Sequence, residues 1–220
     1  MMKNLIDRRD FIKSSAFLTT GTLGLSLIPI ASSASDLPVE DRECVLGPRD
    51  GFSPHVGTLL SMMTWMRNTI LYPVNGMTTE QLDYIHDDNS NSIGAMLLHL
   101  AATERFYQVH TFESKKWGDW SEVDKKRFGV AMALGDEGRK TIKGNNLDFY
   151  LSALKEVREN TIKEFKMRDD KWLMAVDESW GWGPTNNYCK WFHVCEHESN
   201  HNGQIKYIKG RLPGAKPSRD

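Results

Sequence analysis

The sequence predicts an all-α fold, a four-helix bundle with one long crossover between the second and third helices. Four long segments repeat apolar residues at helical spacing, and no segment of useful length alternates apolar and polar residues as a half-buried strand does. The crossover is expected over residues 114–145, a charged region that contains glycine and suits short helical pieces. Bundles build metal and ligand sites from side chains on facing helices, so inward polar residues are the candidates for function.

The first helix is expected over residues 53–72. Ser53 and Pro54 provide an N-cap followed by a proline at the first helical position. Pro73 is expected to end this helix, because proline lacks the backbone N–H that an interior position needs. One short helical turn follows at residues 78–82.

Three further helices are expected over residues 92–112, 146–167 and 185–209. Gly203 in the last of these is expected to allow another helix to approach closely. The helices also carry apolar residues beyond a single stripe, which favours a homodimer; examples are Tyr107, Val109 and Tyr150.

Composition excludes several classes of protein. The 220 residues include 28 Lys and Arg against 29 Asp and Glu, so a formal net charge of −1 gives no general attraction to nucleic acid. An apolar content of 40% is too high for a disordered chain, and three cysteines cannot fill a four-thiolate metal site. The expected partner is therefore a small molecule.

Residues 1–34 have the pattern of an export signal. Arg8 and Arg9, with Phe11 and Lys13 close behind, resemble a twin-arginine signal, and a mildly apolar stretch and small residues follow. A membrane helix is the alternative, which the shortness of the stretch and its Pro29 disfavour. We therefore expect a periplasmic or otherwise exported protein that is free of the membrane once the signal is removed. The remaining chain divides into a linker (35–54), the bundle (55–212) and a tail (213–220).

The histidines are the strongest functional signal. His193, His197 and His201 lie four residues apart on the last expected helix, so neighbours share one face and two of them can bind one ion. A rigid helix cannot bring three successive turns to one tetrahedral ion, so a third ligand is expected from a facing helix. His99 is the candidate, because it lies on an apolar face where small residues such as Ala95 leave room.

Alternatives stay open for these and neighbouring residues. Inward histidines are often core residues with hydrogen-bonded rings, but three imidazoles without a metal need partners for six ring nitrogens. Glu196 and Glu198 are expected on the flanks of the helix, in solvent. Cys195 is expected to be a small buried residue, with a thiolate ligand as the alternative. His55, His86 and His110 are expected to have ordinary structural roles. Trp180 and Trp182 are expected to pack in the core or to line the pocket entrance.

Two segments resemble the signatures of the DinB-like (DinB/YfiT) family of four-helix metal-binding proteins. One runs from Ser92 to Leu100, and the other is the histidine series ending in His201-Asn202-Gly203-Gln204-Ile205. The resemblance covers about residues 55–212, and it departs at Asn202, where the family often has a basic residue. It implies one divalent ion held by His99, His197 and His201, with His193 and Gln204 beside the ligands.

The resemblance also implies a plausible chemistry. Some family members are metal-dependent transferases of low-molecular-weight thiols. Three neutral ligands leave an open position for water or a thiol, so a thiol transferase or a hydrolase is expected. Imidazole binds several metals; zinc is the first expectation, with nickel, iron or manganese as alternatives. Other hypotheses are a non-catalytic metal- or ligand-binding protein of the stress response, and an inactive bundle that only contacts partners.

Overall fold

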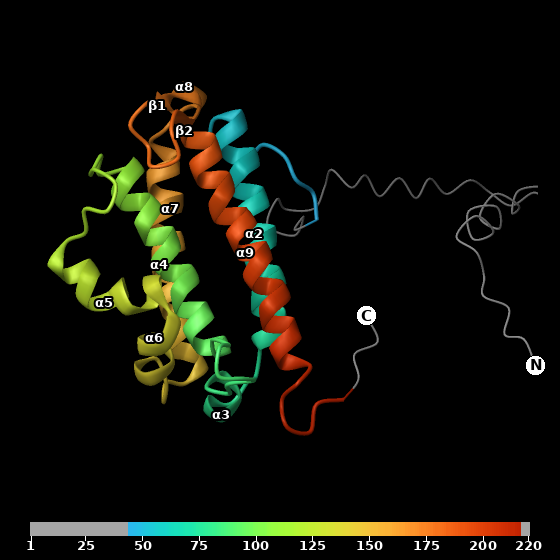
Figure 1. The fold of residues 1–220 in the computed structure, drawn as a ribbon. Coiled ribbons are helices and arrows are strands. Elements are labelled where there is room, and N and C mark those ends of the chain that lie inside the picture. Colours follow the sequence, from blue (N-terminus) through green and yellow to red (C-terminus); the bar gives the residue numbers. More distant parts are fainter. Residues whose placement is uncertain (1–43, 217–220) are drawn as a thin grey trace, which may run out of the picture. The chain divides into compact units, whose positions relative to one another are not determined.

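The computed structural model describes residues 44–216, and in them helices dominate (Figure 1). The expected signal segment 1–34, the linker up to residue 43 and the tail from residue 217 lie outside the described residues. No helix in the described range is long and apolar enough to cross a membrane. The elements are α2 (Pro54–Val74), α3 (Thr79–Leu82), α4 (Ile93–Thr111), α5 (Glu122–Ala133), α6 (Gly135–Thr141), α7 (Leu147–Lys166), α8 (Asp170–Met174), β1 (Val176–Asp177), β2 (Thr185–Asn186) and α9 (Asn187–Lys209).

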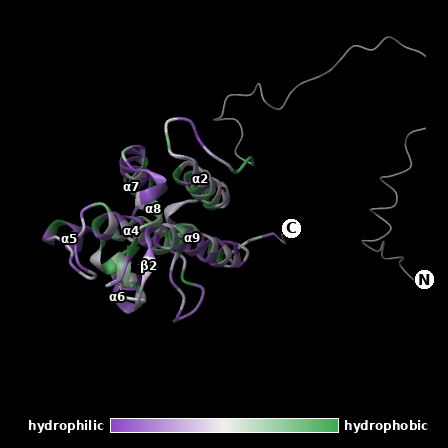
Figure 2. Ribbon diagram, turned by 90° about the horizontal axis from the view of Figure 1, so that it is seen from above, coloured by the Kyte–Doolittle hydropathy of each residue, from purple (hydrophilic) through white to green (hydrophobic). Residues whose placement is uncertain are grey.

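Four long helices, α2, α4, α7 and α9, form the bundle, which confirms the predicted all-α class. Helix α4 packs against α7 and α9, and α2 packs against α9. The crossover between α4 and α7 folds into α5 and α6, and α5 also packs on α4. Seen from above in Figure 2, α4 consequently lies between α5, α7 and α9.

Local sequence signals explain where most of these helices begin. The side chains of Ser92, Asn146 and Asn186 each accept a hydrogen bond from a backbone N–H in the first turn of α4, α7 and α9. Thr78 and Gln81 form a reciprocal capping box around α3. These caps satisfy backbone donors that have no partner within the helix, so the start of each helix is fixed locally.

The start of α2 is capped from a distance. Ser53 is the N-cap residue, as predicted, but its hydroxyl donates to Oδ1 of Asp170 at 2.6 Å instead of capping the helix. The same carboxylate oxygen accepts from the backbone N–H groups of His55 and Val56 at 3.0 and 3.2 Å. An acidic residue of α8 therefore neutralises the positive end of the α2 dipole.

Two predicted helix boundaries are wrong. Helix α2 does not end before Pro73 but includes it and ends at Val74, because a proline in the last turn removes a single hydrogen bond. Helix α9 begins at Asn187 and not at 185, because Thr185 and Asn186 pair with β1 as an antiparallel strand. The first difference is thus local, whereas the second comes from strand pairing that the helical pattern does not contain.

Helix α4 is the centre of the bundle, and every residue in it except Arg105 is buried. Tyr107 and Val109 of α4, like Tyr150 of α7, are each at most 2% exposed within a single chain. The inference of a dimer surface from these three residues is therefore wrong, since the chain's own helices cover them. A homodimer stays a prediction without their support.

Gly94 of α4 packs tightly against Tyr150 of α7. A Cβ atom added there would lie 2.7 Å from the Tyr150 ring, closer than real Cβ contacts. Helix α4 thus meets α7 over the aromatic ring of Tyr150. The predicted role of Gly203 in close approach is wrong, since an added Cβ there would meet nothing within 4 Å.

A cluster of four buried charges crosses the core, with one residue from each long helix. Arg67 of α2 and Arg158 of α7 are paired with Glu104 of α4 and Glu198 of α9, and all four are at most 8% exposed. Nη2 of Arg67 lies 2.7 Å from Glu104, and Nε of Arg158 lies 2.8 Å from it. The prediction that Glu198 lies in solvent is therefore wrong.

Glu104 is bonded to both arginines of this cluster. Its Oε1 also accepts a hydrogen bond from Thr161 at 2.7 Å. Burial works against ionisation of Glu104, but the neighbouring Arg158 and Arg67 outweigh it and hold its pKa below the usual range. The carboxylate is thus ionised, and its charge is matched inside the core.

We predict that Glu104→Gln lowers the free energy of unfolding by about 3–5 kcal/mol, because it leaves a buried positive charge uncompensated. Urea denaturation of the purified protein measures this loss. The matched control is Glu156→Gln, which removes a solvent-exposed carboxylate paired with Arg127 and is expected to cost less than about 1 kcal/mol. Equal losses in the two variants would contradict a special role for the buried cluster.

Candidate metal centre

The first member of the candidate centre, His99, lies in the middle of α4 and is 8% exposed. Its Nδ1 donates a hydrogen bond to the backbone oxygen of Ala131 in α5 at 2.8 Å. This bond places the proton on Nδ1, so Nε2 carries a lone pair, which faces Nε2 of His197 at 2.8 Å. A helix of the crossover therefore sets both the orientation and the tautomer of His99, a contact that sequence reasoning missed.

His197 and His201 occupy successive turns of α9, on the face that meets α4. Nδ1 of His201 donates to Oε1 of Gln204 at 3.1 Å, and Gln204 in turn donates to Asn200 at 3.1 Å. The hydrogen bond on Nδ1 again leaves Nε2 free to bind an ion. Gln204 thus lies where the sequence places it, beside a predicted ligand.

The three rings converge on one point between α4 and α9. Nε2 of His99 and Nε2 of His197 are 2.8 Å apart, and the ring centroids of His201 lie 5.0 and 4.7 Å from those of His99 and His197. One nitrogen from each ring falls within 4.8 Å of the others, a spacing that small ring rotations bring to a single ion. The structure thus brings together all three residues that the sequence singles out; their role as ligands stays a prediction.

The electrostatics of the three rings favour metal binding. The pKa of His197 is lowered to about 3 and that of His201 to about 4. Burial is the largest cause of both shifts, and the neighbouring imidazoles are the second. Burial also lowers the pKa of His99, against its backbone hydrogen bond. All three rings are therefore neutral at neutral pH, so protons compete for their nitrogens only in acid.

Three imidazole nitrogens suit a divalent transition-metal ion. The cluster contains histidine alone, so no carboxylate or thiolate would offset the charge of the ion. Cys195 is not part of it: that thiol is buried, and burial followed by nearby Glu198 raises its pKa to about 11. The expectation of a small buried cysteine is thus favoured over a thiolate ligand.

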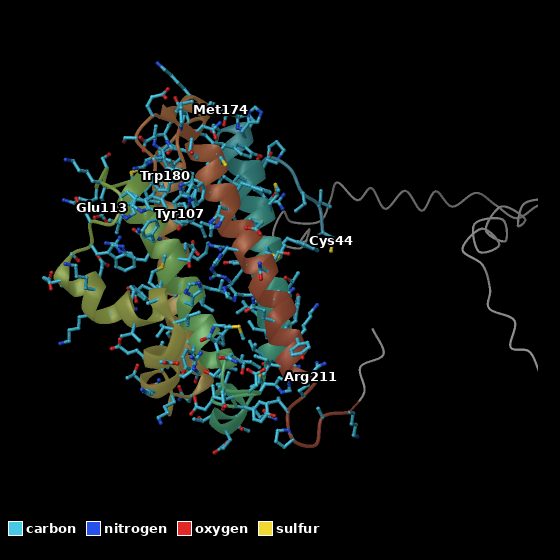
Figure 3. All side chains as sticks on the ribbon, viewed as in Figure 1. Cys44, Tyr107, Glu113, Met174, Trp180 and Arg211 are labelled. Carbon is cyan, nitrogen blue, oxygen red and sulfur yellow. The ribbon has the colours of Figure 1, made fainter. Side chains whose placement is uncertain are left out.

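His193 lies one turn before His197 and outside the converging set. Its ring centroid is 5.4 Å from that of His197, and its Nδ1 shares a hydrogen bond with the Tyr107 hydroxyl at 2.8 Å. Burial raises the pKa of Tyr107, so the hydroxyl keeps its proton. Figure 3 shows Tyr107 on α4 close to Trp180, at the end of the bundle where α9 begins.

A recess of about 600 Å³ lies near His201, and its lining includes Gln204, the hydrogen-bond partner of His201. Gly203 faces this recess, and the missing side chain keeps it open. Nδ1 of His86 and Oδ1 of Asn91 are buried at its wall without a hydrogen-bond partner among the described residues. The lining consists of His86, Asp87, Asn89, Ser90, Asn91, Met96, Asn200, Gly203, Gln204, Tyr207 and Ile208.

The remaining predicted residues lie outside the centre. Glu196 is exposed, as predicted, and its Oε2 is 3.8 Å from Nε2 of His193. His55 binds Asp170, and His110 packs against Trp117, so both have the expected structural roles. His86, also expected to be structural, lines the recess instead.

The fold and the site define the class of protein: a helical bundle in which three converging histidines could hold a metal ion. A family model described as mycothiol-S-transferase, of the DinB/YfiT-like superfamily, matches residues 58–214, and the chain belongs to this family. No curated protein matches the chain. A solved structure of a conserved protein from Enterococcus faecalis shares the fold, with a TM-score of 0.52 and 12% identity over 69% of this chain and 93% of that one.

We predict that replacing His99, His197 or His201 by Ala reduces metal affinity sharply, because two imidazoles hold a divalent ion poorly in water. His193→Ala is expected to weaken binding by at most about 10–100-fold, as removal of a residue beside the ligands does. Metal content after dialysis against a competing chelator measures the difference. Circular dichroism verifies that each variant stays folded, and equal metal content in wild type and His197→Ala would contradict the assignment.

Proposed function

We propose that this chain is a metal-dependent thiol S-transferase whose single divalent ion is held by His99, His197 and His201. The observation that carries the proposal is the convergence of three neutral imidazoles without any carboxylate. Three neutral ligands leave the full charge of a divalent ion and an open coordination position for an anionic thiolate. A bound ion of this kind lowers the pKa of a thiol and so supplies the nucleophile.

The chain's own residues orient this chemistry. The Ala131 carbonyl holds His99, and Gln204 holds His201, so both rings present Nε2 in a fixed direction. His197 comes from the same face of α9 as His201. Fixed ligands reduce the reorganisation needed when a substrate binds, which is the general advantage of a preorganised site.

The recess beside His201 is the proposed binding place of the thiol. Its lining offers amide, hydroxyl and carboxylate groups beside apolar surface, and it contains no Lys or Arg, so it suits a substrate without negative charge. Mycothiol, the thiol in the description of the family, is accordingly the first to test. Zinc is the first metal to test, followed by nickel, iron and manganese, all of which imidazole binds.

We predict that protein carrying the metal found by elemental analysis in its native cell transfers mycothiol to an electrophile. His197→Ala is expected to lose this activity together with the metal, while Glu156→Gln, far outside the centre, keeps it. Glutathione, a thiol with two carboxylates, is expected to be a poorer substrate because the recess offers no cation. Metal binding without thiol transfer would contradict the proposal and favour a non-catalytic metal-binding protein.

We also propose that the chain is exported through the twin-arginine pathway, from the pattern of residues 1–34. Replacing Arg8 and Arg9 together by Lys is expected to retain the protein in the cytoplasm with the segment attached. Cell fractionation and the mass of the purified protein measure this. Normal processing of the double variant would point instead to a general signal peptide, which needs only positive charge.

A further inference from the structure

Three tryptophans gather where α9 begins, next to the candidate metal centre. Trp117 comes from the loop after α4, and Trp180 and Trp182 come from the loop between β1 and β2. The Trp117 and Trp180 rings are 4.6 Å apart, and Trp182 lies 6.0 Å from Trp180 and 6.1 Å from Trp117. Trp180 is buried, but Trp117 and Trp182 are 46% and 51% exposed, so the cluster presents indole surface to solvent.

Neighbouring residues pack against two of the three rings, Trp117 and Trp180. A Cβ atom on Gly181 would lie 2.9 Å from the Trp117 ring, so the loop packs directly on this indole. Nζ of Lys190 lies 4.1 Å over the Trp180 ring and is anchored by Asp177 at 2.9 Å. Fixed apolar surface in water is costly unless a ligand uses it, and such patches mark binding sites.

The cluster is continuous with the metal centre. The Trp182 ring lies 5.0 Å from that of His193, which in turn lies 5.4 Å from that of His197. The recess begins at Asn200 and Gln204, further along α9. About 16 Å of helix between His193 and Gln204 therefore separates the tryptophan cluster from the recess, with the candidate metal centre between them.

We propose that Trp117 and Trp182 form the binding platform for the second substrate, a planar electron-poor electrophile such as an activated aromatic ring. This inference rests on the proposed thiol transfer. Indole rings are electron-rich, and carbon atoms that thiols attack are electron-poor, so the two stack favourably. With an aryl halide, a carbon–sulfur bond forms, the carbon–halogen bond breaks, halide leaves with the bonding electrons, and the thiol proton passes to water.

The experiment measures binding apart from turnover. The probe is 1,3-dinitrobenzene, which is planar and electron-poor but has no leaving group, titrated into metal-loaded protein by ligand-observed NMR. Wild type is expected to bind saturably, Trp182→Ala about fivefold to tenfold more weakly, and Trp182→Phe in between, because one stacked ring is lost or reduced. The matched control is Trp65→Ala, which removes an exposed tryptophan of α2 and is expected to bind as wild type does.

Kinetics then distinguish the platform from a general effect on the centre. Trp182→Ala is expected to raise the KM for 1-chloro-2,4-dinitrobenzene about fivefold while the KM values for the thiol and for non-aromatic iodoacetamide stay unchanged. Equal probe binding in wild type and Trp182→Ala, or an equal loss in Trp65→Ala, would overturn the platform. Probe binding that depends on Trp182 without thiol transfer would support the platform and contradict the proposed function instead.

Discussion

The buried cluster of Arg67, Glu104, Arg158 and Glu198 is the constraint on which the arrangement of the bundle depends. Each long helix contributes one charge, and any rotation of a helix would leave its charge unpaired in the core. Glu198 directly follows His197, so the ion pairs that fix Glu198 also fix the face of α9 that carries the histidines. Glu104 sets the rotation of α4 in the same way, which turns His99 toward α9. The candidate centre is therefore oriented by charges that do not touch it.

The fold was largely predictable because its helices are bounded by local signals. The caps at Ser92 and Asn146 act on neighbouring backbone atoms, so sequence spacing suffices to find them. Prediction failed where another pairing competed with the helix: β1 pairs with the two residues expected to begin α9. It also failed for α4. This helix is buried on all sides, so its apolar residues beyond one stripe indicate a central helix and not a dimer surface.

The candidate centre was predictable to a similar extent. Histidine spacing and the family resemblance identify the converging residues, because side chains four residues apart on a helix lie on the same face. They did not find Ala131, whose contact with His99 is a backbone oxygen and carries no signature in the sequence. Glu198 was misplaced because its partners lie 40 and 131 positions away. Long-range pairing of this kind follows from the tertiary fold alone.

The charge balance of the core has a consequence for chemistry. Two arginines and two glutamates compensate each other, so they add no net charge beside the histidines. The low pKa values of His197 and His201 accordingly have burial as their main cause, followed by the neighbouring imidazoles. A divalent ion in this setting would keep its whole charge for a substrate anion, because the histidine cluster found among residues 44–216 contains no carboxylate. The recess near His201 and the exposed tryptophans near His193 give the centre two neighbouring binding surfaces. This arrangement supports the proposed transfer between two organic substrates over hydrolysis, which needs a place for only one.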